Sequence, residues 1–211
     1  MKDALPQTIY LKDYQVSPFL VDTTDLVFDL GDEQTRVTTN LAVRRNPDSS
    51  DKAAVLELNS KGDVQLQWVE IDGQRLNDSD YMLSDNMLTL SNLPTSCVIT
   101  TEVRIQPQLN TSMMGLYRSR TMYCTQCEAE GFRRITYFPD RPDIMSIFTV
   151  KIVADKASYP ILLSNGNAIS RSDLEGGRHS ITWHDPFKKP SHLFALVAGT
   201  LAVVEDSFTT V

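Results

Sequence analysis

Along much of this chain, apolar and polar residues alternate one by one. In one such stretch Leu26, Phe28 and Leu30 share one side of the chain. The same pattern recurs in residues 37–44, 99–105, 148–152 and 180–184. Successive side chains of a β-strand point to opposite faces, so a period of two predicts strands that bury one face and leave the other in water. The sequence therefore predicts strands rather than helices.

Short turn signals separate these stretches. Asp72-Gly73 and Asn165-Gly166 supply the positive φ angles that tight hairpins need. Clusters of glycine, proline, asparagine and aspartate mark longer turns at residues 31–32, 46–50, 92–94 and 175–177. Turns at such intervals indicate many short strands in one unit.

Three places depart from strict alternation. Around Trp68 the apolar phase slips, and we favour a β-bulge over a strand that is buried on both faces. Residues 108–120 are typical of a loop that could include a helical turn. Residues 129–138 fit a short helix that ends before Pro139. The sequence thus predicts one mainly β unit, with at most one or two short helices and with sheets packed or curled together.

Composition and charge argue against several classes of function. Acidic residues outnumber basic ones by 27 to 20, and no basic patch is present, so we expect no nucleic-acid partner. No apolar run approaches the roughly 18 residues of a transmembrane helix. The start of the sequence has no signal-peptide pattern, and three cysteines fit a reducing compartment. We therefore expect a cytoplasmic protein.

Histidines and cysteines offer little for a metal site. His179, His184 and His192 stand in no H-E-x-x-H or H-x-H arrangement, so we expect surface or hydrogen-bonded histidines. Cys124 and Cys127 form a C-x-x-C, which could be a redox pair or half of a zinc site. A zinc site needs a second pair and a thioredoxin-like pair needs a βαβ unit, so two reduced thiols are the favoured interpretation. No metal ligand or catalytic triad is expected from these residues.

The residues around this C-x-x-C contain another candidate site. If residues 122–128 are extended, Gln126 and Glu128 project from one face and Cys127 points the other way. An amide beside a carboxylate can hold an ammonium group by charge-assisted hydrogen bonds, each worth about 1.5–3 kcal/mol when shielded from water. The spacing alone favours a plainer interpretation, a solvated polar strand face.

Five blocks of the sequence carry a resemblance to a known family. They span residues 123–143, 148–156, 159–167, 183–190 and 193–199, and the first contains Thr125-Gln126-Cys127-Glu128. In this order they resemble the N-terminal domain of the bacterial alanyl aminopeptidase (aminopeptidase N) family. Residues 1–120 resemble the same domain more loosely, chiefly around Tyr14 and the turn at 92–94. The resemblance therefore covers residues 1–211 as a single N-terminal β domain.

The resemblance implies both a fold and an activity. The fold is a large curved antiparallel β-sandwich or saddle that packs on a thermolysin-like catalytic domain. The activity is zinc-dependent removal of N-terminal amino acids from peptides. The family's zinc motif H-E-x-x-H and its exopeptidase motif G-A-M-E-N do not occur in this sequence. We therefore expect the catalytic domain of the same polypeptide to bind the zinc, and we expect no peptidase activity from this chain alone.

The family's T-Q-x-E segment implies a role for two residues. By position its amide and carboxylate are Gln126 and Glu128, which would line the pocket for the first residue of the peptide substrate. Glu128 would accept a hydrogen bond from the substrate's free α-ammonium group. Asp140, Arg141 and Pro142 also match a family block and are expected to form a structural turn or a domain contact. An alternative from another class is a stand-alone, non-catalytic β-sandwich that serves as a binding or scaffold module.

Overall fold

The structure, a computed structural model, describes residues 8, 10–51 and 55–209. Strands dominate this part of the chain, so the mainly β fold class is confirmed. Within these described residues, helical structure is limited to 3-10 turns of three residues each, which are shorter and more numerous than the one or two helices expected. They are η1 (Leu11–Asp13), η2 (Pro107–Leu109), η3 (Phe132–Arg134), η4 (Glu175–Gly177) and η5 (Ser191–Leu193).

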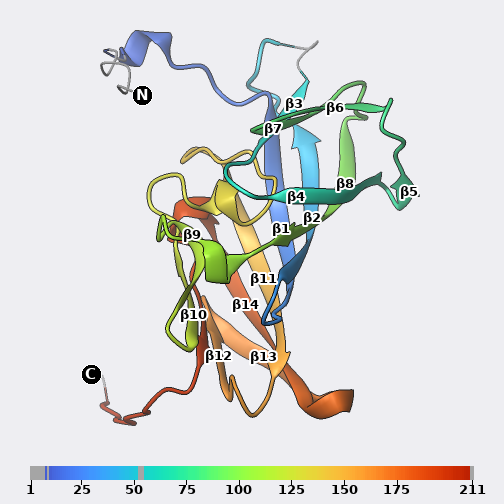
Figure 1. Cartoon of the computed structure of the whole chain (residues 1–211). Helices are drawn as coiled ribbons and strands as arrows, with labels where there is room; N and C mark the ends of the chain where they lie inside the picture. The colour runs from blue at the N-terminus through green and yellow to red at the C-terminus, as the bar shows by residue number, and fades with distance from the viewer. Residues whose placement is uncertain (1–7, 9, 52–54, 210–211) are drawn as a thin grey trace.

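The strands form three sheets (Figure 1). The largest has the order β13-β14-β11-β1-β2-β8-β4-β5. Its strands are β1 (Phe19–Asp29), β2 (Thr35–Arg45), β4 (Gln65–Ile71), β5 (Gln74–Arg75), β8 (Ser96–Ile105), β11 (Met145–Asp155), β13 (Asn167–Asp173) and β14 (Arg178–Pro190). A four-stranded sheet has the order β12-β15-β10-β9, with β9 (Gly115–Ser119), β10 (Met122–Gln126), β12 (Ile161–Ser164) and β15 (Leu196–Gly199). The third sheet, β3-β7-β6, comprises β3 (Leu56–Asn59), β6 (Tyr81–Ser84) and β7 (Met87–Leu90).

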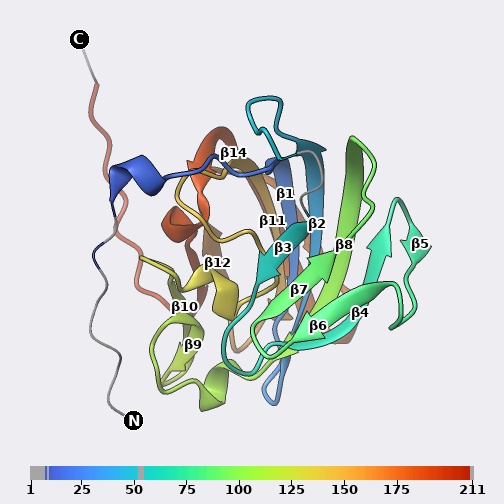
Figure 2. The same cartoon turned by 90° about the horizontal axis from the view of Figure 1, so that it is seen from above.

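The alternating residues build a core that all three sheets share. Phe28 on β1 and Ile99 on β8 are buried, as are Leu88 on β7 and Tyr123 on β10. The large sheet curves around the two smaller ones, which Figure 2 shows from above. β1, β2, β8 and β11 thus bury one face, as their period of two predicts. β14 does not follow the alternation predicted at 180–184, because Ser180 and Ile181 are both buried.

The centre of the large sheet departs from the expected antiparallel pattern. β1 and β11 pair in parallel, and Thr23 lies opposite Ile147. The buried hydroxyls of Thr24 and Ser146 bond across this pair at 2.8 Å. A parallel pair needs a long crossover, which here is the whole chain between β1 and β11. Every other strand pair among the described residues is antiparallel.

The predicted turns and the bulge have mixed outcomes. Asp72 and Gly73 have φ angles of 50° and 79° and join β4 to β5 in a tight hairpin, as predicted. The β4–β8 register shifts between Leu66 and Trp68, which confirms the bulge. The hairpin predicted at 165–166 is wrong, because this turn joins β12 to β13 and the two strands belong to different sheets. The turn chemistry is local, whereas the choice of pairing partner is not.

Two further segments differ from their predictions. Residues 108–120 are expected to form a loop that could include a helical turn; η2 overlaps the start of this segment, but β9 occupies 115–119. β9 lacks alternation because its first two residues are both buried, and so a period-two pattern cannot reveal it. The short helix predicted over 129–138 contracts to the single turn η3.

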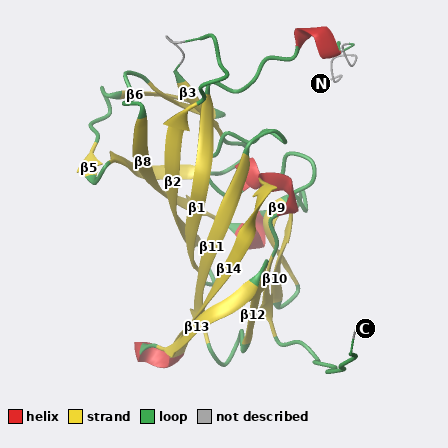
Figure 3. Cartoon of the chain, turned by 180° about the vertical axis from the view of Figure 1, so that it is seen from behind, coloured by secondary structure: helices red, strands yellow, loops and turns green. Residues whose placement is uncertain are grey.

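Both terminal segments leave the body on the same side of the molecule. The segment with η1, residues 10–16, and the last described residues, 200–209, extend from one side in Figures 1 and 2, and the view from behind in Figure 3 agrees. Among the described residues, no helix has the length and apolar character required to cross a bilayer.

Candidate functional site

β10 brings Gln126 to the surface of the four-stranded sheet. The strand lies between β9 and β15 and is fixed on both sides. The hydroxyl of Tyr123 donates to the carbonyl oxygen of Gly31 at 2.9 Å, and the backbone N–H of Leu196 donates to the hydroxyl of Thr125 at 2.8 Å. These contacts hold the last residues of the strand in place.

The chain leaves β10 at Gln126 and reverses in a tight turn. The N–H of Gly131 donates to the carbonyl of Cys127 at 2.8 Å, and η3 follows directly. The condition considered for residues 122–128, an extended run, therefore holds only as far as Gln126, because the strand stops there. We call residues 127–131 the reverse turn.

The reverse turn nevertheless brings the two predicted site residues together. Gln126 and Glu128 are exposed and Cys127 is buried between them. The side-chain N–H of Gln126 donates to the backbone carbonyl of Glu128 at 3.2 Å. The peptide bond between Glu128 and Ala129 is cis. Because the amide contacts the backbone of Glu128, the carboxylate is left available.

The two carboxylates of the reverse turn differ in their surroundings. The carboxylate of Glu130 lies 3.3 Å from the guanidinium of Arg133. That of Glu128 takes part in no ion pair within the part of the chain that the structure describes. An exposed carboxylate without a protein cation can accept a ligand's ammonium group without first losing a partner.

Two glycines allow the reverse turn to fold back onto the sheet. A Cβ atom at Gly131 would lie 2.2 Å from the carbonyl oxygen of Gln126 and 3.0 Å from the backbone nitrogen of Gly115. Gly115 is paired with Gln126 in the β9–β10 register and has a φ of 75°, which favours glycine. The backbone of the reverse turn at Gly131 thus packs directly on the backbone of β9 and β10.

A buried carboxylate anchors the far end of the loop that follows. Asp140 accepts from Nε of Arg133 at 2.9 Å and from the backbone N–H of Arg133 at 3.2 Å. Its other oxygen accepts from the hydroxyl of Ser191 at 2.5 Å, and its backbone N–H donates to the side chain of Asn59 at 3.2 Å. Asp140 therefore ties the loop to η5 and β3.

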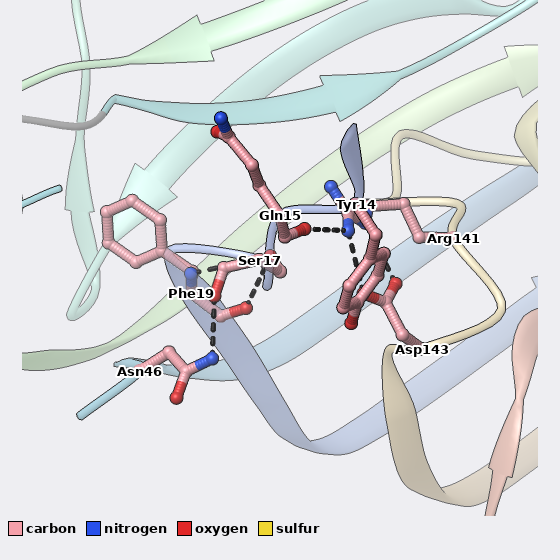
Figure 4. Close-up of polar contacts among 7 residues, drawn as sticks. All are labelled: Tyr14, Gln15, Ser17, Phe19, Asn46, Arg141 and Asp143. Carbon is pink, nitrogen blue, oxygen red and sulfur yellow. Dashed lines mark hydrogen bonds and ion pairs between the residues drawn. The ribbon is translucent and has the colours of Figure 1, made fainter. Parts of the chain in front are cut away.

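The residues after Asp140 bind the N-terminal segment (Figure 4). Arg141 donates through Nη2 to the carbonyl of Gln15 at 2.9 Å and pairs with Asp143, whose carboxylate also accepts from the hydroxyl of Tyr14 at 2.9 Å. The hydrogen bond from Arg141, followed by that from Tyr14, lowers the pKa of Asp143 against the opposing effect of partial burial. Arg141 and Asp143 thus clasp residues 14–15.

The surroundings of Cys127 are unlike those of a redox-active cysteine. All three are free, and Cys127 is 3% exposed. Burial raises the pKa of the Cys127 thiol and also that of Cys97. A redox-active pair requires a thiol whose pKa is lowered, so the environment of Cys127 is the opposite of the one required.

The described residues do not fit a zinc ion. No group of three or more histidine, cysteine, aspartate or glutamate side chains lies close enough together within this part of the chain to hold a metal. Nε2 of His179 bonds to the carbonyl of Tyr159 at 2.8 Å, and Nδ1 of His184 bonds to Thr149 at 3.2 Å. These two histidines have structural partners, as expected.

Gly131, Arg133 and Ser191 take part in the site but were not found from the sequence. Arg133 and Ser191 reach Asp140 from 7 and 51 positions away. No local pattern encodes such distances. The glycine carried a local signal, a turn residue just after the T-Q-x-E segment, but only the fold shows what it packs against.

Comparisons with known proteins agree with this architecture. The family described as the Peptidase M1 N-terminal domain matches residues 22–193. Aminopeptidase N of Caulobacter vibrioides is 49% identical over 210 residues, which are 100% of this chain and 24% of that protein. Aminopeptidase N of Escherichia coli is 46% identical over 206 residues, which are 97% of this chain and 23% of that protein.

A solved structure gives the same result. The crystal structure of Legionella pneumophila aminopeptidase A in complex with aspartic acid is 34% identical and has a TM-score of 0.86, over 91% of this chain and 22% of that one. This chain thus spans about a quarter of the length of the curated relatives it matches. With the family match over most of its residues, the chain belongs to the family of Peptidase M1 N-terminal domains.

Proposed function

We propose that this chain is the N-terminal domain of a zinc aminopeptidase of the aminopeptidase N type, which removes N-terminal amino acids from peptides. The domain contributes one wall of the pocket for the substrate's first residue. Membership of the Peptidase M1 N-terminal domain family supports this, as do the two relatives called aminopeptidase N. The observation that carries the proposal is the exposed carboxylate of Glu128 beside Gln126, which forms an ion pair with none of the described cationic side chains.

Glu128 recognises the substrate's free α-ammonium group. Its carboxylate accepts a charge-assisted hydrogen bond, worth about 1.5–3 kcal/mol once the site is shielded from water. An internal peptide bond presents no ammonium group, so this contact selects the end of a chain. The side-chain amide of Gln126 donates a hydrogen bond to the carbonyl of Glu128 and thereby orients the Glu128 side chain.

Zinc and the catalytic groups belong to another domain of the same polypeptide. When bound, zinc supplies a Lewis acid and activates a water molecule. The described residues offer no donor set for it, so we assign the metal to the catalytic domain against which this domain packs. Peptides and that catalytic domain are accordingly the partners of this chain.

We also propose a cytoplasmic location. Cys97, Cys124 and Cys127 are free thiols, which suits a reducing compartment. Fractionation that places the protein in an oxidising compartment would refute this assignment.

The test replaces Glu128 in the full-length enzyme. Glu128→Gln keeps an acceptor but removes the charge. We therefore expect kcat/KM for an alanyl anilide to fall roughly tenfold, which corresponds to a loss of about 1.5 kcal/mol of transition-state stabilisation. Glu175→Gln is the matched control, since Glu175 is an exposed glutamate in η4, which joins β13 to β14. If both variants keep the wild-type kcat/KM, Glu128 does not bind the ammonium group.

A further inference from the structure

The reverse turn that carries Glu128 has an exposed tip, residues 128–130, and is held at both ends by a frame of buried residues. Residues 128–130 are exposed, while Cys127 on one side and Phe132 on the other are buried. The ring of Phe132 packs edge-on against that of Phe138, with their centroids 5.0 Å apart. The position of the Glu128 side chain therefore depends on what fixes this frame.

Arg133 connects the tip to the interior. Its Nη2, which also bonds to Asp140, lies 3.3 Å from the carboxylate of Glu130, whose side chain is 62% exposed. Its Nε donates to the carboxylate of Asp140 at 2.9 Å, and its Nη2 donates to the carbonyl oxygen of Asp140, also at 2.9 Å. The side chain of Asp140 is 2% exposed, so a single arginine spans from solvent to the core.

Asp140 is itself a fixed point. The hydroxyl of Ser191, at the start of η5, donates to it, and the side chain of Asn59, at the end of β3, accepts its backbone N–H. The backbone of Asn59 also exchanges two hydrogen bonds with Phe138, at 2.8 and 3.2 Å. β3 and η5, which are distant in sequence, thus both bind Asp140, the residue with which Arg133 forms its ion pair.

We infer that Arg133 and Asp140 are positioning residues for recognition of the substrate's ammonium group. They fix the reverse turn so that the Glu128 carboxylate lies where the peptide N-terminus arrives. The inference rests on the proposed function of Glu128. It assigns a role to a partly buried ion pair that touches neither substrate nor metal.

Arginine is suited to this role because its planar fork donates in several directions at once. Lysine keeps the charge but cannot donate both to the carboxylate and to the carbonyl of Asp140 while it reaches Glu130. Arg133→Lys therefore loosens the turn and leaves the buried charge of Asp140 paired. Displacing a recognition group by about 1 Å can cost up to about 100-fold in rate.

The test is a double-mutant cycle in the full-length enzyme. We expect Arg133→Lys alone to lower kcat/KM for an alanyl anilide by about tenfold, mainly through KM. In the Glu128→Gln background the same change should cost about twofold or less, because the group being positioned is gone. Loss of folded enzyme would instead lower kcat, leave KM unchanged and act equally in both backgrounds.

Arg141→Lys is the matched control. Arg141 lies in the same loop and also uses its fork, but it grips Asp143 and the backbone of Gln15 on the N-terminal segment. It should leave both kinetic constants near those of the wild type.

A second variant keeps the inference testable if Arg133→Lys does not fold. Ser191→Ala removes only one hydrogen bond to Asp140 and nearly preserves the volume of a buried side chain. We expect it to raise KM about threefold, and this rise should disappear in the Glu128→Gln background.

The outcomes separate the inference from the proposed function. If Glu128→Gln has no effect, the proposed function fails, and the inference fails with it. If Glu128→Gln weakens catalysis but the effects of Arg133→Lys or Ser191→Ala simply add to it, Glu128 keeps its role and only the positioning role is overturned.

Discussion

Replacing Gly131 with alanine should disturb the reverse turn for purely steric reasons. Gly131 has φ −80° and ψ −25°, which any residue adopts without strain. The added Cβ would lie 2.2 Å from the carbonyl oxygen of Gln126 and 2.8 Å from the Cα of Cys127. Both are backbone atoms of β10 or its immediate extension, so they cannot rotate away as a flexible side chain would.

The expected magnitude follows from this geometry. Real Cβ atoms essentially never approach closer than 3.0 Å, so the contact with the Gln126 oxygen falls 0.8 Å short. The backbone must shift by about that amount against the 2.8 Å hydrogen bond from Gly131 to Cys127. Overpacking of this kind costs typically 1–3 kcal/mol, and we expect about 3 kcal/mol because backbone must move.

Urea unfolding of the chain, followed by tryptophan fluorescence, measures this loss. Gly176→Ala is the control: its Cβ would meet nothing within 4 Å, but φ is 69°, so only backbone strain of about 1–2 kcal/mol is expected. In the full-length enzyme Gly131→Ala should also lower kcat/KM, whereas Gly176→Ala should not. A Gly131→Ala chain that unfolds at the wild-type urea midpoint would refute the close approach.

Two further predictions concern the N-terminal clasp and the thiols. The pKa of Asp143 is lowered in the folded chain, so its contacts with Arg141 and Tyr14 stabilise the N-terminal segment fully above the ordinary pKa of 3.8, and this stabilisation is lost as the pH falls through the lower folded pKa. In that pH window, hydrogen exchange at residues 14–15 should accelerate before exchange of the core amides does. Simultaneous acceleration of both would contradict a local clasp. Cys124 should react with a maleimide well before Cys97 and Cys127, because burial raises the pKa of the latter two thiols. Mass spectrometry of the labelled chain measures the order of reaction. If Cys127 is labelled as fast as Cys124, its thiol is not buried.

Local chemistry accounts for the part of the fold that the sequence predicts. Strands with one buried face show a period of two, and Asp72-Gly73 and the bulge at Trp68 follow from rules that act over a few residues. The exposed positions of Gln126 and Glu128 around buried Cys127 match the expectation, although the strand ends at Gln126 and the reverse turn, not strand alternation, exposes Glu128. Their role came from a family resemblance, since spacing alone favoured a solvated surface.

Long-range partners account for what the sequence does not predict. β1 and β11 pair in parallel because of the path of the whole chain, not because of any residue in either strand. β9 carries no alternation. Arg133, Asp140 and Ser191 form one network only after η5 has packed beside the loop. Such contacts depend on the completed fold, and the individual residues give no sign of them.

The parallel pair at the centre of the large sheet also sets the order in which the domain can assemble. β1, β2 and β8 can pair as soon as residue 105 has been made, but β11 is not complete until residue 155. Until then one backbone edge of β1 lacks its partner, and the buried Thr24–Ser146 bond, which spans 122 positions, cannot form. Closing so long a loop is slow, and an open strand edge can pair with another chain. During synthesis, the half-built sheet is therefore the state most exposed to aggregation, and docking of β11 ends that exposure.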